Sequence, residues 1–133
     1  MNKNWYGQFA FYIDPKFKSS DKELFRIVSA DLESLGATLF DDPSEKLNTK
    51  LPSIFLVNSD SETDFHIKDS DHCFVFGGAN MSIFGQRQFP GRSQRIENAR
   101  EWNDLFKKLD ELLSQDCKAV ESELVERALK NFK

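Results

Sequence analysis

The segment from Asp71 to Phe89 constrains the fold most, because two aromatic-rich stretches flank the quartet Gly77-Gly78-Ala79-Asn80. Glycine and asparagine adopt positive φ at little steric cost, so the quartet suits a tight reversal between two strands. The first stretch, Cys73–Phe76, is apolar on both faces, which is typical of a strand covered on both sides. The segment therefore predicts a β-hairpin at the centre of the sheet.

Four other stretches have strand patterns. Trp5–Ile13 and Phe65–Lys68 have a side-chain period of two, as strands do. Ser53–Val57 is apolar on both faces and predicts a buried strand, and Ala37–Phe40 is a short fourth candidate. Asp14-Pro15 is expected to end the first strand, because proline cannot continue a hydrogen-bonded ladder.

One helix is expected directly after the first strand. Ser20 and Glu23 have the spacing of a capping box, and Gly36 suits a left-handed C-cap. Apolar residues between them recur every three or four positions, so a helix is predicted from Asp21 to Leu35.

The last third of the chain predicts two more helices. Pro90-Gly91 is expected to break the sheet, with Ser93 as the following N-cap. Apolar residues recur at helical spacing from Ile96 to Leu113 and, after a polar interruption at Ser114–Asp116, from Val120 to Phe132.

The 133 residues are enough for one sizeable core, which the 13 phenylalanines are suited to fill. The pattern predicts a single α+β domain over residues 1–133. Its sheet is expected to be largely antiparallel with a central hairpin, one helix after the first strand and two C-terminal helices.

A cytoplasmic location is expected. The residues after Met1 lack the apolar segment of a secretory signal, and no apolar run approaches the roughly 20 residues of a membrane span. The two cysteines, Cys73 and Cys117, are too few for a disulfide framework, so both are expected to be reduced.

The net charge of −4 argues against nucleic acid as a direct partner. Residues 14–71 hold thirteen acids against seven bases, or −6, whereas residues 72–100 hold four arginines against one glutamate, or +3. Acidic side chains gather in three turns at predicted strand ends, where convergence on one edge would attract a basic protein. Such turns also serve simply as solvated loops. The candidate partner-binding residues are Asp41, Asp42, Glu45, Asp60, Glu62, Asp64, Asp69 and Asp71.

His66 and His72, near several carboxylates, leave a small hydrolase-type enzyme as an alternative function. No recurrent ligand spacing accompanies them, so neither a metal nor a cofactor is predicted. Cys73 is expected to be a buried structural thiol, because His72 points to the opposite face of the same strand.

A second alternative is a ligand-binding or regulatory module. Four arginines follow the predicted hairpin turn, and such side chains bind anions or carboxylates in a bidentate manner. They also suit ion pairs with the acidic segment of the same chain. The residues concerned are Arg87, Arg92, Arg95 and Arg100.

In size, acidity, lack of an export signal and compact α+β plan, the chain resembles the small cytosolic immunity proteins with which bacteria neutralise toxins delivered by their neighbours. The resemblance implies a stoichiometric, non-enzymatic inhibitor of a cognate toxin, often a nuclease, whose basic cleft receives carboxylates in place of phosphate. The chain departs from immunity families that carry an Asn-Gly-Gly turn after a helix, because its Gly77-Gly78 pair is predicted between strands.

Overall fold

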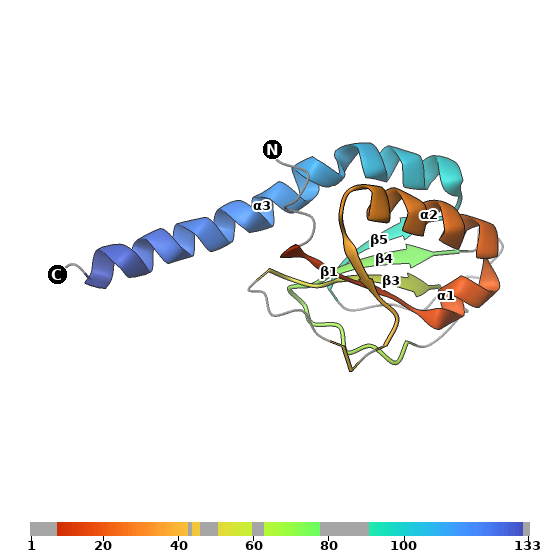
Figure 1. The fold of residues 1–133 in the computed structure, drawn as a ribbon, viewed down its shortest axis with the longest axis horizontal. Helices are drawn as coiled ribbons and strands as arrows, with labels where there is room; N and C mark the ends of the chain where they lie inside the picture. Colours follow the sequence, from red (N-terminus) through yellow and green to blue (C-terminus); the bar gives the residue numbers. More distant parts are fainter. Residues whose placement is uncertain (1–7, 43, 46–50, 60–62, 78–90, 132–133) are drawn as a thin grey trace.

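A computed structural model describes residues 8–42, 44–45, 51–59, 63–77 and 91–131 of the chain. These residues form one five-stranded sheet and three helices (Figure 1). In chain order the elements are β1 (Ala10–Ile13), α1 (Pro15–Ser20), α2 (Lys22–Ser34), β2 (Thr38–Phe40), β3 (Ile54–Asn58), β4 (His72–Phe76), β5 (Arg92–Ile96) and α3 (Ala99–Asn131).

Every pair of neighbouring strands in this sheet is parallel, and the strand order is β2-β1-β3-β4-β5. The fold is therefore α/β, and the predicted antiparallel sheet with a central hairpin is wrong. The prediction failed at β4 and β5, which pair in parallel with His72 opposite Arg92 and Phe76 opposite Ile96. The chain between them must return along the whole strand, so it is a long crossover rather than a tight turn.

Gly77, the first residue of the predicted turn, does have a positive φ of 123°. Its conformation ends β4 and does not reverse the chain into a paired strand. The remaining turn residues and the second predicted arm, residues 78–90, lie outside the described residues.

The first predicted helix is confirmed as α2, with boundaries close to those expected. Asp21 is its N-cap and accepts a hydrogen bond from the Leu24 N–H at 3.1 Å, and Gly36 follows its end with φ of 84°. A short additional helix, α1, occupies Pro15–Ser20, with Asp14 as N-cap and proline in its first turn.

The C-terminal region forms one helix where two were predicted. Ser114–Asp116 continues the helix. Ser114 Oγ donates to the Glu111 carbonyl of the preceding turn at 3.1 Å, Gln115 is exposed, and Asp116 contacts His72 and Arg92. The helix also begins later than predicted, since Arg92–Ile96 is strand β5 and Ser93 is not an N-cap.

The predicted strand Phe65–Lys68 is absent from the described sheet, although its alternation has a physical cause. Phe65 and Ile67 are 7% exposed, and both pack on the sheet, while His66 and Lys68 face solvent. The period of two thus reflects an irregular segment lying flat against the sheet.

Helices and irregular chain cover opposite faces of the sheet (Figure 1). On the helical face, Phe11, Leu56 and Phe76 pack with Leu32 of α2 and Leu109 of α3. This arrangement explains why β3 and β4 are apolar on both faces, because each face has its own cover.

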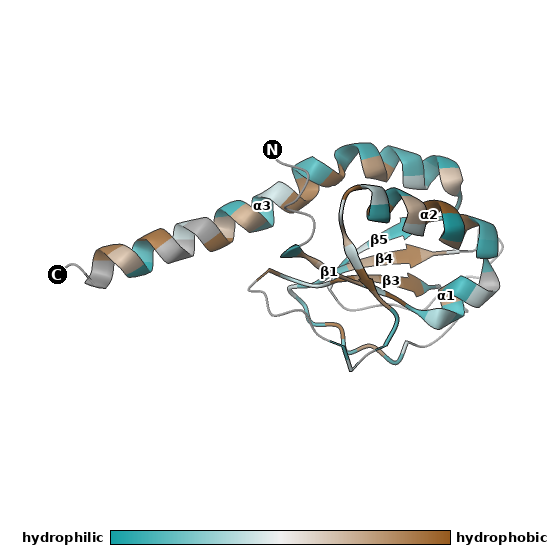
Figure 2. Ribbon diagram, viewed as in Figure 1, coloured by the Kyte–Doolittle hydropathy of each residue, from teal (hydrophilic) through white to brown (hydrophobic). Residues whose placement is uncertain are grey.

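The helix-free face carries a second apolar cluster beneath the connections that follow β2 and β3. Tyr12 lies at its centre, with ring centroids 5.0 Å from Phe55 and 5.4 Å from Phe65. Hydrophobic colour accordingly concentrates along the central strands, while β5 is hydrophilic and the helices carry both colours (Figure 2). Within the part of the chain that the structure describes, no helix is long and apolar enough to cross a membrane.

Candidate functional site

The first acidic set directly follows β2, at the carboxyl edge of the sheet. Asp41, Asp42 and Glu45 are all exposed. Asp42 accepts hydrogen bonds from the Ser44 backbone N–H at 2.9 Å and the Ser44 hydroxyl at 2.8 Å, which lower the pKa of the Asp42 carboxyl. This turn therefore presents the ionised Asp42 carboxylate to solvent.

The other acidic residues lie on the connection between β3 and β4. Asp64 and Asp69 are exposed, whereas Asp60 and Glu62 lie outside the described residues. Asp71 is 6% exposed, and its carboxylate accepts the backbone N–H groups of Ser53 at 2.9 Å and Lys68 at 3.0 Å. Its carboxylate therefore organises the connection and is not presented to solvent.

The acidic sets share a face rather than an edge of the sheet. Asp41 follows β2 at the carboxyl edge, but Asp69 precedes β4 at the amino edge, and the length of a five-residue strand separates these edges by about 16 Å. Tyr12 joins the two connections: its hydroxyl donates to the Glu45 carbonyl at 3.0 Å, and its ring contacts Phe65. Both acidic connections are thus attached to the helix-free face (Figure 1).

Burial raises the pKa of Tyr12, and the negative charges of Asp71 and Glu45 raise it further. The phenol is therefore a neutral donor that fastens the first connection to the sheet. Sequence reasoning did not single out Tyr12, because its role depends on a carbonyl 33 residues away.

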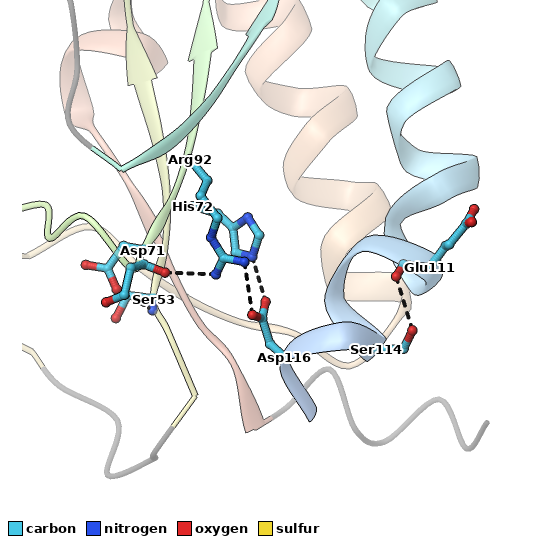
Figure 3. Close-up of polar contacts among 8 residues, drawn as sticks. Ser53, Asp71, His72, Arg92, Glu111, Ser114 and Asp116 are labelled. Carbon is cyan, nitrogen blue, oxygen red and sulfur yellow. Dashed lines mark hydrogen bonds and ion pairs between the residues drawn. The ribbon is translucent and has the colours of Figure 1, made fainter. Parts of the chain in front are cut away.

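A partly buried polar cluster at the amino edge joins β4, β5 and α3 (Figure 3). The Nε2 atom of His72 lies 2.7 Å from Oδ2 of Asp116, and Arg92 Nη1 lies 3.0 Å from Oδ1 of the same carboxylate. Arg92 also donates to the Ser70 carbonyl at 2.8 Å. His72 is 1% exposed, and no described residue offers a hydrogen bond to its Nδ1.

Burial lowers the pKa of His72, although the hydrogen bond to Asp116 opposes that shift. A neutral imidazole that donates through Nε2 to Asp116 leaves Nδ1 as an unprotonated acceptor, which is the less costly atom to bury unpaired. Because Nδ1 is enclosed by the protein, the cluster has the geometry of a structural anchor for α3 rather than of a general base.

The residues suggested for enzymatic chemistry are not brought together as a catalytic group. His66 is exposed on the second connection, whereas His72 is buried against α3. Burial raises the pKa of Cys73 to about 12, against the opposing effect of a hydrogen bond with Ser93, so Cys73 is a protonated thiol. In the described ranges, no group of three or more His, Cys, Asp or Glu residues is placed to hold a metal ion.

Two of the arginines placed by the structure, Arg92 and Arg95, have ion-pair partners within the chain. Arg92 binds Asp116, and Arg95 Nε lies 3.6 Å from a carboxylate oxygen of Glu97. Arg100 is exposed at the start of α3, and Arg87 lies outside the described residues. Asp116 itself was missed by sequence reasoning, since only the folded chain brings it to a histidine 44 residues away.

Polar residues are also buried at the carboxyl edge between β1 and β3, where the strand order changes direction and open α/β sheets commonly bind ligands. The Asp14 carboxylate accepts the Lys16 N–H at 2.9 Å, and a Cβ atom on Gly77 would lie 2.7 Å from Ser59 Oγ. Ser59 Oγ has no hydrogen-bond partner among the residues that the structure describes. Gly77 and Ser59 thus approach each other closely at this edge.

Comparison with known proteins gives no assignment: no protein-family model matches the chain, and no curated protein or solved structure is significantly similar to it.

Proposed function

We propose that this chain is a non-enzymatic immunity-type inhibitor that binds a basic protein partner, such as a cognate nuclease toxin, through the acidic loop layer on its helix-free face. The acidic loop layer comprises the connections after β2 and β3. The exposed carboxylates that would contact the partner are Asp41, Asp42, Glu45, Asp64 and Asp69.

The observation that carries this proposal is the placement of both acidic connections on one face of the sheet. Residues 41–71 hold eight acids against three bases, which gives a net charge of −5. This segment is therefore more negative than the whole chain, whose net charge is −4. Phe65 and Ile67 of this layer point into the apolar cluster, while Asp64 faces outward. The layer therefore combines a fixed apolar underside with a negatively charged outer surface.

Such a surface accelerates encounter with a positively charged partner and disfavours partners of like charge. A nuclease that binds a phosphate backbone presents the required positive charge. The interaction is expected to weaken as salt rises, because the Debye length falls from about 30 Å at 0.01 M to about 8 Å at 0.15 M.

The state of the reactive side chains favours binding over catalysis as the function. His72 is enclosed at the amino edge, and Cys73 is protonated beneath the loop layer. A nucleophile or general base needs access to substrate and a suitable protonation state, which neither group has.

The test uses the purified product of the gene adjoining this one, measured for binding by calorimetry and for toxicity during co-expression. The variant Asp41→Lys/Asp64→Lys/Asp69→Lys should raise Kd at least about tenfold and reduce its salt dependence. Asp42 is left unchanged because it caps the Ser44 turn.

The matched control is Glu33→Lys/Asp104→Lys/Glu111→Lys, which changes three exposed acids on the helices and alters the net charge equally. It should leave Kd within about threefold of that of the unchanged protein. Equal weakening of binding by both variants would show that the effect comes from net charge alone. If no complex forms, the proposed inhibitor function is wrong.

A further inference from the structure

A polar contact adds to the apolar packing that holds α3 on the sheet. Leu109 and Leu113 bury the first part of the helix against the core, and Asp116 then contacts His72 and Arg92 (Figure 3). Farther along, the helix projects away from the body of the domain (Figure 1). The attachment of the helix near Asp116 therefore depends partly on the charges of three side chains.

His72 is the member of this contact whose charge changes most readily near neutral pH. Its side chain is 1% exposed, whereas those of Asp116 and Arg92 are 13% and 46% exposed. No described residue offers a hydrogen bond to His72 Nδ1. A proton added to this nitrogen would therefore be buried without a described acceptor, which is costly.

The charged groups that act on His72 come from α3, from β5 and from the connection before β4. The Asp116 carboxylate carries one negative charge and already pairs with Arg92. Asp71 adds a second carboxylate, but this one already accepts two backbone N–H groups. Burial lowers the pKa of His72, and Arg92 lowers it further, against the opposing effects of Asp116 and Asp71.

Separation of α3 from the start of β4 would return the imidazole of His72 to water. An imidazole in water has a pKa of about 6.5, so the separated arrangement binds a proton more readily than the packed one. Falling pH favours whichever arrangement binds more protons. Acidification therefore favours separation of the helix from the sheet at this point.

We propose that His72 and Asp116 form a pH-sensitive attachment, at which protonation of His72 releases the segment of α3 around Asp116 while the rest of the domain stays folded. The released segment comprises residues 114–120. The preceding part of α3 stays in place because Trp102, Leu109 and Leu113 are fully buried in the core. This release is local and is thus distinct from unfolding of the whole domain.

Hydrogen exchange of the full chain, measured by mass spectrometry and divided by the intrinsic exchange rate at each pH, detects the release. Exchange of residues 114–120 should rise several-fold, and at most about tenfold, between pH 7.5 and 5.5, because a free imidazole is about nine-tenths protonated at the lower pH. The rise should change little in low urea, since a local opening exposes little surface. The amides of α2 should exchange more slowly at both pH values, with the steeper urea dependence of global unfolding.

Three variants assign the effect to this contact. His72→Gln keeps a side-chain N–H for Asp116 but does not titrate, so it should abolish the rise in exchange on acidification. His66→Gln, at an exposed site, should leave the rise unchanged. Arg92→Gln removes the cation that competes for the Asp116 carboxylate and should make the rise smaller. Its side chain is exposed, so Arg92→Gln decides the matter if His72→Gln does not fold.

Four results would overturn the proposal. The first is equal exchange of residues 114–120 at both pH values in the unchanged chain. The second is a rise that persists in folded His72→Gln, and the third is a rise in Arg92→Gln as large as that in the unchanged chain. The fourth is exchange of residues 114–120 with the same urea dependence as that of α2, which would assign the effect to global unfolding.

Discussion

His72 Nε2 lies 2.7 Å from Asp116 Oδ2, and this contact joins the start of β4 to α3. Arg92 binds the other oxygen of the same carboxylate, so one acidic side chain holds two strands and a helix together. The contact lies where the helix leaves the sheet. It therefore adds a polar attachment to the apolar packing of α3 on the sheet.

Replacement of Asp116 tests this attachment. Asp116→Ala leaves a buried imidazole N–H without an acceptor and should lower the free energy of unfolding by about 1–3 kcal/mol. Asp116→Asn retains an acceptor oxygen and should cost less. Urea denaturation measures both, with Asp104→Ala at an exposed site of α3 as the control. Equal stability of the alanine variant and the unchanged protein would show that the contact does not anchor α3.

The His72 environment predicts a loss of stability on mild acidification. Its folded-state pKa lies below the ordinary value of about 6.5, so the unfolded chain binds a proton more readily. This contribution is complete above about pH 6.5 and is lost as pH falls below that value. His72→Gln should reduce the slope of unfolding free energy between about pH 7.5 and 5.5.

His66→Gln provides the control for that measurement, because His66 is exposed. It should leave the pH slope as it is in the unchanged protein. A slope that persists in His72→Gln, or stability that rises on acidification, would contradict the assignment of a neutral buried His72.

Gly36 and Gly91 allow the energetic cost of left-handed backbone strain to be measured separately from the cost of steric overlap. Both have φ of 84°, but a Cβ atom on Gly36 meets nothing within 4 Å, while one on Gly91 would lie 2.7 Å from the Asp71 carbonyl oxygen. Gly36→Ala should therefore cost about 1–2 kcal/mol from left-handed strain alone. Gly91→Ala should cost more, because the obstructing atom belongs to the backbone; thermal unfolding that ranks the two variants equally would refute this.

The parts of the fold that the sequence predicted correctly depend on local chemistry. Ile54–Val57 and Cys73–Phe76 are buried strands, as their two apolar faces indicate. Helix α2 lies where its apolar period and Gly36 indicate, although its N-cap is Asp21 and not the predicted Ser20. These signals need no knowledge of the rest of the chain.

Strand direction was not predictable from the Gly77–Asn80 quartet. Turn residues permit a reversal but do not require one, and a long crossover can begin with the same glycine conformation. The edge strand β5 adds to the difficulty, because Arg92–Arg95 is polar and only Ile96 is buried. In retrospect, two strands apolar on both faces favour a parallel sheet.

The sequence predicted which acidic residues make up the candidate site, but not how they are arranged in space. The acids of residues 41–71 are plain in the sequence, but their shared face follows from Tyr12 holding the first connection beside Phe65. Asp71 could not be recognised as an internal ligand of backbone N–H groups, because Ser53 precedes it by 18 residues.

The unequal covering of the sheet has a consequence for how such a chain can evolve. The helical side is constrained by interlocking side chains, where a change in volume is felt throughout the layer. The irregular side is held by a few aromatic contacts and one buried carboxylate, and connections of this kind accept insertions and substitutions readily. Its outer residues can therefore change with successive partners while the strands beneath keep their register.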